Sequence, residues 1–369
     1  MNGLFIGLMS GTSLDGVDGV LAHWTPEPQP TWLAHAFVPF PTALRQTFLE
    51  LHQARAHELE QAQLAGLDLA RLYAQVTQEL LETRQLKPAD IRAIGAHGQT
   101  IRHRPVINGG VGYSLQVHQA AYLAELTGIS VVADFRSRDI AAGGQGAPLV
   151  PAFHQALWGD SSRRVAVLNL GGIANLSLLD PHRPLLGFDC GPGNMLLDAW
   201  HQRHRGGHYD DAGSWAAQGQ VHAALLQTLL KEPFFQAPAP KSTGRDLFHL
   251  DWLQAHLQTQ APLNPVDVQA TLLELTAQSS SMALLRHMPA PQELVVCGGG
   301  AFNRTLMQRL SELLPCPVLS SADKGLHPNQ VEAAAFAWLA RRTLLGLPGN
   351  VPEVTGARGP RVLGAIYPA

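Results

Sequence analysis

Short aliphatic runs that stop abruptly at glycine or aspartate recur along this chain. Such runs, bounded by turn-forming residues, are typical of strands buried on both faces of a layered α/β sheet, where apolar residues need not alternate with polar ones. The pattern predicts strands at Leu4–Leu8, Ile91–Ile94, Ile129–Ala133, Val165–Leu170 and Leu294–Val296.

Segments rich in Ala, Leu, Gln and Glu lie between these runs. Residues 69–80 carry an apolar stripe at helical spacing that stops before Pro88, which predicts an amphipathic helix. A further helix is expected over 330–342. Asn329 is its expected N-cap, because an amide oxygen can accept a hydrogen bond from a free N–H of the first turn.

A strand followed by glycine occurs three times, near 7–16, 170–175 and 297–303. Two similar α/β halves, each directing a glycine turn towards a shared cleft, would explain this recurrence. A chain of 369 residues is also long for one core, so two domains are the usual solution. Glycine and proline concentrate over 141–151, which predicts the boundary there. The expected lobes are 1–140 with 346–369, and 141–345.

The charge pattern excludes several classes of partner. A formal net charge of −3 provides neither a basic field for nucleic acid nor a polybasic patch for a membrane surface. The three cysteines form no C-x-x-C pair, which favours a reducing compartment. The first residues carry no positive charge, and their apolar run is too short for a signal peptide or a membrane span. We therefore expect a cytoplasmic protein.

The segment "GLMSGTSLDGVDGVL", residues 7–21, has the composition of a phosphate-binding loop without the usual lysine. No lysine of the chain follows a glycine, and no G-x-G-x-x-G stands at a strand-to-helix junction, so the common fingerprints of nucleotide sites are missing. Small residues nevertheless allow backbone N–H groups to approach phosphate oxygens closely. Asp15 or Asp18 could hold Mg²⁺. The alternative is a tight β-hairpin with Asp-Gly turn chemistry.

Two further stretches repeat the design, "NLGGIANLS" at 169–177 and "VCGGGAFN" at 296–303. Each alone is equally compatible with a structural turn. Three such turns after three strands favour a nucleotide held between two lobes, with a metal ion and backbone groups in place of lysine. The candidate nucleotide-binding residues in these two stretches are Asn169, Gly171, Gly172, Gly298, Gly299, Gly300 and Asn303.

These motifs, taken together, resemble one family. The matching segments, in chain order, are "MSGTSLDGVD", "HGQTIRHRP", "DFRSRDIAAGGQGAPLVP", "NLGGIANLS", "GFDCGPGN", "PKSTGRDLF", "CGGGAFN", "EAAAFAWLA" and "VTGARGPRVLGAIYP". Collinear over essentially the whole chain, they resemble the anhydro-N-acetylmuramic acid kinases of bacteria.

The resemblance implies a two-domain fold of the actin, Hsp70 and sugar-kinase type (ribonuclease H-like), with the active site in an interdomain cleft. It implies that ATP, Mg²⁺ and one water act on 1,6-anhydro-N-acetylmuramic acid, so that the anhydro ring opens and O6 is phosphorylated during recycling of cell-wall fragments. It also implies a homodimer. The first loop would bind ATP through Gly11, Thr12, Ser13, Leu14, Asp15, Gly16, Val17 and Asp18.

Asp189 is the catalytic base that the resemblance implies, because it occupies the aspartate of the "GFDCGPGN" motif. Partial desolvation beside Phe188 would raise the pKa of this carboxyl towards a range useful for base catalysis. Taken alone, Asp189 could instead cap the helix that follows it. The chain departs from the family pattern at Cys190, His118 and Phe302, and none of these removes a proposed catalytic group.

The candidate substrate ligands each have a structural alternative. His97 and Gln99 of "HGQT" could bind sugar hydroxyls or simply pack the loop. Arg136 could bind the lactyl carboxylate through its guanidinium fork, or pair with nearby aspartates. Glu332, at the start of the expected helix, could accept a sugar hydrogen bond or favour the helix dipole.

Two other functions stay open at this stage. An ordinary hexose or amino-sugar kinase would keep the same site and use Asp189 to deprotonate a hydroxyl. A nucleotide-gated binding protein of the Hsp70 kind would have no small-molecule substrate.

Overall fold

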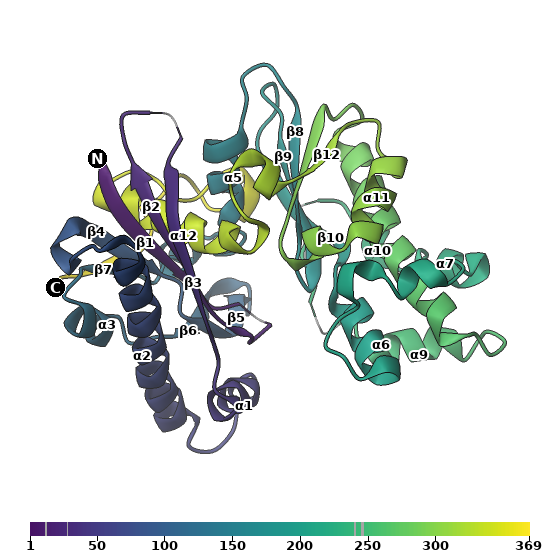
Figure 1. Ribbon diagram of the computed structural model, residues 1–369, viewed down its shortest axis with the longest axis horizontal. Helices are drawn as coiled ribbons and strands as arrows, with labels where there is room; N and C mark the ends of the chain where they lie inside the picture. The colour runs from purple at the N-terminus through teal and green to yellow at the C-terminus, as the bar shows by residue number, and fades with distance from the viewer. Residues whose placement is uncertain (12, 28, 240, 245–246) are drawn as a thin grey trace. The chain divides into compact units, whose positions relative to one another are not determined.

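The structure is a computed structural model that describes residues 1–11, 13–27, 29–239, 241–244 and 247–369. Thr12, one of the predicted nucleotide-binding residues, lies outside the described residues. The chain divides into two compact units, the first of Met1–Phe153 with Gln330–Ala369 and the second of His154–Asn329 (Figure 1). Each unit is built on its own sheet.

The sheet of the first unit has the strand order β13-β7-β4-β1-β2-β3. Strands β1, β2 and β3 form an antiparallel meander, whereas β4 and β7 continue the sheet in parallel with β1. The strands predicted at 4–8 and 91–94 are confirmed, and the one predicted at 129–133 begins at Val131. The strand bounds are β1 Gly3–Met9, β2 Gly16–Trp24, β3 Thr31–Pro39, β4 Ile91–Ala96, β7 Val131–Ala133 and β13 Ala365–Tyr367.

Helix α12, Val331–Leu344, lies directly on the backbone of this sheet. Gly7 of β1 and Gly95 of β4 are neighbours in the parallel pair. A Cβ atom on Gly7 would lie 1.8 Å from the Ala333 carbonyl oxygen, and one on Gly95 would lie 2.0 Å from that of Phe336. The two glycines and the buried alanines of "EAAAFAWLA" therefore allow helix and sheet to approach closely.

The opposite face of the sheet carries the main hydrophobic core of this unit. Ile6 and Leu8, which flank Gly7, point there and pack with Tyr73 and Val76 of helix α2, Glu58–Arg84. The amphipathic helix predicted over 69–80 is part of α2. Helices α1, Thr42–Leu51, and α3, Ala120–Thr127, pack beside α2 (Figure 1).

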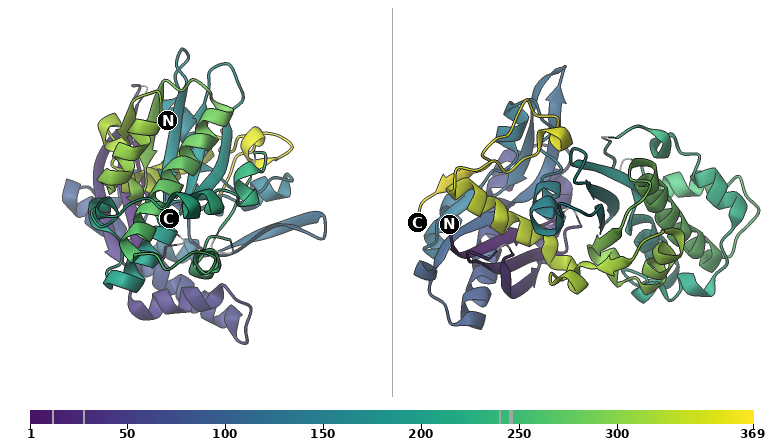
Figure 2. Two further views of the ribbon diagram at one scale, coloured as in Figure 1. Left: turned by 90° about the vertical axis from the view of Figure 1, so that its right-hand side faces the viewer. Right: turned by 90° about the horizontal axis from the view of Figure 1, so that it is seen from above.

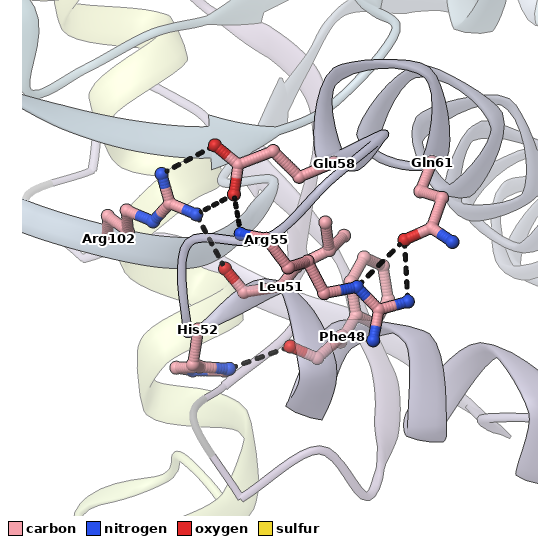
Figure 3. Close-up of polar contacts among 7 residues, drawn as sticks. All are labelled: Phe48, Leu51, His52, Arg55, Glu58, Gln61 and Arg102. Carbon is pink, nitrogen blue, oxygen red and sulfur yellow. Dashed lines mark hydrogen bonds and ion pairs between the residues drawn. The ribbon is translucent and has the colours of Figure 1, made fainter.

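A two-stranded hairpin, β5 Gln99–Ile107 and β6 Gly110–Val117, projects from this unit (Figure 2). Arg102 of β5 anchors the hairpin, because its guanidinium donates to both carboxylate oxygens of Glu58 and to the Leu51 carbonyl, as Figure 3 shows. The Arg55 backbone N–H donates to the same carboxylate across 3.1 Å. Hydrogen bonds from Arg102 therefore lower the pKa of Glu58 and tie β5 to the α1–α2 connection.

The sheet of the second unit repeats the topology of the first, with the order β10-β9-β8-β11-β12. Strands β8, β9 and β10 form the antiparallel meander, and β11 and β12 run parallel to β8. The strands predicted at 165–170 and 294–296 are confirmed. The strand bounds are β8 Val165–Leu170, β9 Ile173–Leu179, β10 Leu186–Pro192, β11 Glu293–Cys297 and β12 Val318–Ser320.

Helix α10, Pro265–His287, packs against β9 and β10 and carries α11, Arg304–Leu313, beside it (Figure 1). Within the described part of the chain, no helix is both long enough and apolar enough to cross a membrane. The remaining helices are α4 Ser137–Ala141, α5 Val150–Trp158, α6 Met195–Arg205, α7 Ala223–Leu229, α8 Pro233–Gln236, α9 Leu250–Leu257 and α13 Pro352–Thr355.

The shared strand order, a three-stranded meander extended by two parallel strands, is the ribonuclease H-like arrangement expected from the sequence. The unit boundaries fall after Phe153 and Asn329, whereas the sequence suggested 140 and 345. The difference at the second boundary places α12 in the first unit, because this helix packs on β1 and β4. The N-cap of α12 is Gln330, so the expectation of Asn329 was wrong by one residue.

Candidate active site

The first glycine-rich segment forms the turn of the β1–β2 hairpin, in which Met9 pairs with Asp18. The Leu14 N–H donates to the Gly11 carbonyl across 3.2 Å and closes the turn. Gly11, Ser13 and Asp15 are at least partly exposed, and among the described residues a Cβ on Gly11 would come close only to the Ser13 hydroxyl, at 3.7 Å. The described part of the turn therefore leaves room for a phosphate. The segment forms a β-hairpin turn and still leaves room for phosphate, so the two interpretations given for residues 7–21 do not exclude each other.

Other residues of this segment serve the fold. The Leu14 and Val17 side chains are buried in the core, so only their backbone groups remain available to a ligand. Gly16 is required by packing, because a Cβ there would lie 2.3 Å from the Val38 carbonyl oxygen. Asp18 accepts a hydrogen bond from His35, whose Nε2 lies 2.9 Å from the carboxylate.

His97, which is buried, and Arg136, which is partly buried, form a polar pair in the first unit. A guanidinium can only donate, so the 2.8 Å contact from Nη2 of Arg136 makes Nε2 of His97 the acceptor. The His97 proton is then on Nδ1, which donates to the Ser10 carbonyl across 3.3 Å. Burial and the Arg136 charge lower the pKa of His97 to about 3. His97 is therefore a neutral imidazole that orients Arg136.

Gln99 and Glu332 present polar atoms beside this pair. The Gln99 amide donates to the Gly11 carbonyl across 3.2 Å, while its buried Oε1 has no partner among the described residues. Glu332 is partly buried in the first turn of α12. Burial, reinforced by Asp18 and opposed by Arg136, raises the pKa of Glu332. The structure therefore brings all four predicted substrate ligands into one region of the first unit.

The other two glycine stretches meet at one edge of the second sheet. Gly171 and Gly172 form the two-residue turn between β8 and β9, and Gly298 follows β11, which runs parallel to β8. Considering only the residues that the structure describes, the nearest atom to a Cβ on Gly172 would belong to Met195, at 3.7 Å, and the nearest to one on Gly299 would be the Asn194 amide, at 3.6 Å. These positions leave room for a ligand to approach the backbone.

Gly298 and Gly300 are constrained by the protein itself. Gly298 has φ +77°, and a Cβ there would lie 2.4 Å from Oδ1 of Asn169. A Cβ on Gly300 would lie 2.4 Å from the Leu170 Cβ. Asn303 caps α11, because its Oδ1 accepts from the Leu306 N–H across 3.0 Å. The amide oxygen of Asn303 therefore has a structural role.

Asn194 is hydrogen-bonded to the first of these two glycine stretches and lies beside Gly299 and Gly300 of the second, although the sequence analysis assigned it no role. Its side-chain amide donates to the Leu170 carbonyl across 2.9 Å, and its backbone N–H donates to the Gly171 carbonyl across 2.8 Å. The signal was present in the "GFDCGPGN" motif, whose last residue is Asn194.

Asp189 lies in β10, opposite Asn175 of β9, and does not cap α6, whose N-cap is Asn194. One carboxylate oxygen, Oδ2, accepts from the Ser242 hydroxyl and from the Thr243 backbone N–H, each across 2.9 Å. The Asp189 backbone N–H donates to the Lys241 carbonyl across 3.0 Å. The pKa of Asp189 is raised by burial, and these two donors oppose the shift.

Cys190 points away from this carboxylate, at the irregularity in the β9–β10 pairing. Its buried thiol donates to the Ala174 carbonyl across 3.2 Å, and burial raises the pKa of Cys190 to about 12. The thiol is therefore a packed neutral group. Ser242 and Thr243 were not predicted as site residues, although "PKSTGRDLF" was noted as a motif.

A metal ion at this site would need oxygen atoms of the bound substrate to complete its set of ligands. Among the residues that the structure describes, no group of three or more His, Cys, Asp or Glu side chains is arranged to hold one. Asp15 is exposed and Asp18 is half-buried. Mg²⁺ commonly binds through one or two carboxylates together with substrate phosphates, and these two residues fit that role.

Two α/β units of one topology, with glycine turns at their strand ends, define the class that includes actin, Hsp70 and the sugar kinases. A model of the anhydro-N-acetylmuramic acid kinase family matches residues 3–369. The chain belongs to this family of sugar kinases.

Two relatives of high sequence identity agree with this assignment. The chain is 55% identical over 372 residues to the anhydro-N-acetylmuramic acid kinase of Ralstonia nicotianae, with 99% of this chain and 97% of that protein covered. It is 57% identical to the protein of the same name from Bordetella parapertussis, covering 99% and 96%. A ROK-family glucokinase structure from Streptomyces griseus aligns with a TM-score of 0.41 at 14% identity, covering 92% of this chain and 100% of that one.

Proposed function

We propose that this chain uses ATP and water to convert 1,6-anhydro-N-acetylmuramic acid into N-acetylmuramic acid 6-phosphate and ADP. The observation that carries the proposal is the environment of the Asp189 carboxylate. It is half-buried with a raised pKa, and among the described residues its hydrogen-bond donors, Ser242 and Thr243, both reach one oxygen, Oδ2. We assign the other oxygen, which has no donor among those residues, to accept a proton from water, as a general base requires.

The chemistry follows from that proton transfer. Asp189 removes a proton from water as the water oxygen bonds to C1 of the sugar. The C1–O6 bond breaks through an oxocarbenium-like state, as in glycoside hydrolysis. O6 then attacks the γ-phosphorus of ATP, and ADP leaves with the electron pair of the broken P–O bond. The proton on Asp189 returns to solvent, which restores the base.

The phosphates of ATP are assigned to the open backbone of the glycine turns. In the first unit, the assigned phosphate-binding residues are Gly11 and Ser13 of the hairpin loop. In the second unit, they are Gly171, Gly172 and Gly299. Each of these positions has space around its backbone or an exposed side chain. A bound Mg²⁺ would neutralise charge on the phosphates, and Asp15 and Asp18 are the residues to hold it.

The sugar is assigned to the polar cluster of the first unit. Oε1 of Gln99 has no hydrogen-bond partner among the described residues, and together with the Glu332 carboxyl we assign it to accept hydrogen bonds from hydroxyl or amide groups. Arg136 has an Nε–H without a partner among the described residues, and it can bind the lactyl carboxylate. His97 acts through Arg136, since both of its ring nitrogens are already bonded.

The test is ADP release with Mg-ATP and each of three additions: the anhydro sugar, N-acetylmuramic acid, or no sugar. Release that requires the anhydro sugar and yields a 6-phosphate supports the proposal. Labelled water would place its oxygen at C1. Release with N-acetylmuramic acid alone would identify an ordinary amino-sugar kinase. Release without any sugar would identify an Hsp70-like ATPase.

The proposal extends to the setting of the enzyme. We infer a cytoplasmic homodimer that recycles cell-wall fragments. All three cysteines are buried, and no disulfide joins them in the part of the chain that the structure describes, which fits a reducing compartment. Light scattering on purified protein would give the mass of the assembly. A monomer at micromolar concentration would overturn the inference of a dimer.

A further inference from the structure

Asp139, in the short helix α4, is a fully buried carboxylate that ties two distant segments together. Its Oδ1 accepts from the Asn350 amide across 2.6 Å and from the Thr355 hydroxyl across 2.8 Å. Its Oδ2 accepts from the Gly146 N–H across 2.8 Å. Three donors therefore satisfy the buried carboxylate, and two of them come from the C-terminal segment.

Gly146 links the Asp139 carboxylate to Arg136 through its two backbone polar groups. Its N–H is held by Asp139, and the carbonyl of the same residue accepts from Nη1 of Arg136 across 2.7 Å. Gly146 has φ +67°, and a Cβ there would lie 2.8 Å from Cγ1 of Ile140. The position thus favours glycine in one fixed conformation, which sets the direction of its carbonyl.

Arg136 in turn connects Gly146 to the residues just before the first loop, through His97. Its other terminal nitrogen holds Nε2 of His97 across 2.8 Å, and His97 donates to the Ser10 carbonyl immediately before the hairpin turn. A continuous chain of hydrogen bonds in the first unit thus runs from Thr355 through Asp139, Gly146 and Arg136 to His97.

The C-terminal segment 350–361 does not depend on these side chains alone for its position. The Gln145 N–H donates to the Thr355 carbonyl across 2.7 Å, and the Arg358 N–H donates to the Ala142 carbonyl across 2.9 Å. Loss of one side-chain hydrogen bond therefore leaves the segment docked by its backbone. This permits a test on folded protein.

We propose that Asp139, Asn350 and Thr355 are positioning residues that fix the Arg136 guanidinium for the sugar, although none of them touches it. The role assigned to Arg136 in sugar binding rests on the proposed function. The hydrogen-bond path from Thr355 to His97 is independent of that function.

The test uses Thr355→Val, which removes the hydroxyl and keeps the shape of the side chain. Thr355→Ser restores the donor. Thr343→Val is the matched control, because Thr343 is also buried and its hydroxyl donates to the Leu363 carbonyl across 2.6 Å, but it has no hydrogen bond to Asp139. Two readouts are taken: the ¹⁵N resonances of the His97 ring, assigned with His97→Gln, and the steady-state constants.

Thr355→Val is expected to shift the Nε2 resonance of His97 and to raise KM for the anhydro sugar about tenfold with little change in kcat, the size expected for a lost hydrogen bond to a charged group. Thr355→Ser and Thr343→Val should leave both readouts near wild type. A lowered Tm for Thr355→Val with an unmoved His97 resonance and KM would overturn the proposal. If the native chain shows no sugar-dependent turnover, the proposed function fails, and the His97 resonance alone decides the network.

Discussion

The Ser242 hydroxyl donates to Oδ2 of Asp189 across 2.9 Å, on the same oxygen that receives the Thr243 backbone N–H. Both donors stabilise the charged form of a carboxyl whose burial favours the neutral form. The pKa of Asp189 is thus set by opposing effects, of which burial is the larger. The pKa of a carboxyl balanced in this way responds to small changes in its donors.

Asp189→Asn should abolish sugar-dependent ADP release without destabilising the protein at pH 7. The folded-state pKa of Asp189 is raised, so ionisation weakens the fold as the pH rises through that value. An amide, which mimics the neutral carboxyl, avoids that loss. The Tm of the variant should equal or exceed that of wild type at pH 7, and the two should converge below the ordinary pKa of aspartate. A lower Tm at pH 7 would mean that the carboxylate stabilises the fold.

Ser242→Ala should move the acidic limb of the pH–kcat profile to higher pH. The hydroxyl lowers the pKa of Asp189, so its removal lets burial raise that pKa further, and more base is protonated at a given acidic pH. Thr243→Ala is the matched control, because its bond to Asp189 comes from the backbone and survives the substitution. An acidic limb that moves equally in both variants would exclude this role for Ser242.

The fold could be predicted where strands are buried on both faces. β1, β4, β8 and β11 are mostly apolar and buried, and the sequence pattern predicted them. The strand β3 was missed because most of its residues are at least partly exposed, so no apolar run marks it.

The site could be predicted only as far as local motifs extend. Asp189 was proposed from its motif, whereas the donors that hold it, Ser242 and Thr243, lie 53 and 54 residues further along the chain. The neutral state of His97 also depends on Arg136, which is 39 residues away. Contacts of this kind arise from the tertiary fold, and spacing in the sequence does not indicate them.

Gly172→Ala and Gly300→Ala should separate ligand binding from folding. A Cβ on Gly172 meets only an ordinary contact at 3.7 Å, so the fold should persist while the methyl group obstructs phosphate approach. We expect a raised KM for ATP with an unchanged Tm. A Cβ on Gly300 would lie 2.4 Å from the Leu170 Cβ, so that variant should lose about 1–3 kcal/mol of stability. An unaffected KM for ATP in Gly172→Ala would remove this turn from the nucleotide site.

His118→Leu should stabilise the protein, and more so in mild acid. Neither ring nitrogen of His118 has a hydrogen-bond partner among the described residues, and burial lowers the pKa of His118 to about 4. Burying such a polar group costs about 1 kcal/mol or more. As the pH falls from about 6.5 towards 4, the unfolded chain gains a proton here that the folded chain does not, so the fold weakens.

The measurement for His118→Leu is Tm from pH 7 to pH 5, with the exposed His208→Leu as a control for lost charge. The difference between His118→Leu and wild type should widen over that range. A constant difference would show that His118 does not contribute to acid sensitivity.

Asp18→Asn should raise the Mg²⁺ concentration needed for half-maximal rate more than Asp15→Asn does. Asp18 contributes to the raised pKa of Glu332, so these two carboxyls repel each other, and a divalent cation between them and the phosphates would relieve that repulsion. Asp18 is also held by His35, whereas Asp15 lies exposed on the turn. The rate is measured against free Mg²⁺ at saturating sugar, and about a tenfold shift is expected from loss of one carboxylate ligand. A larger shift for Asp15→Asn would assign the ion to the turn instead.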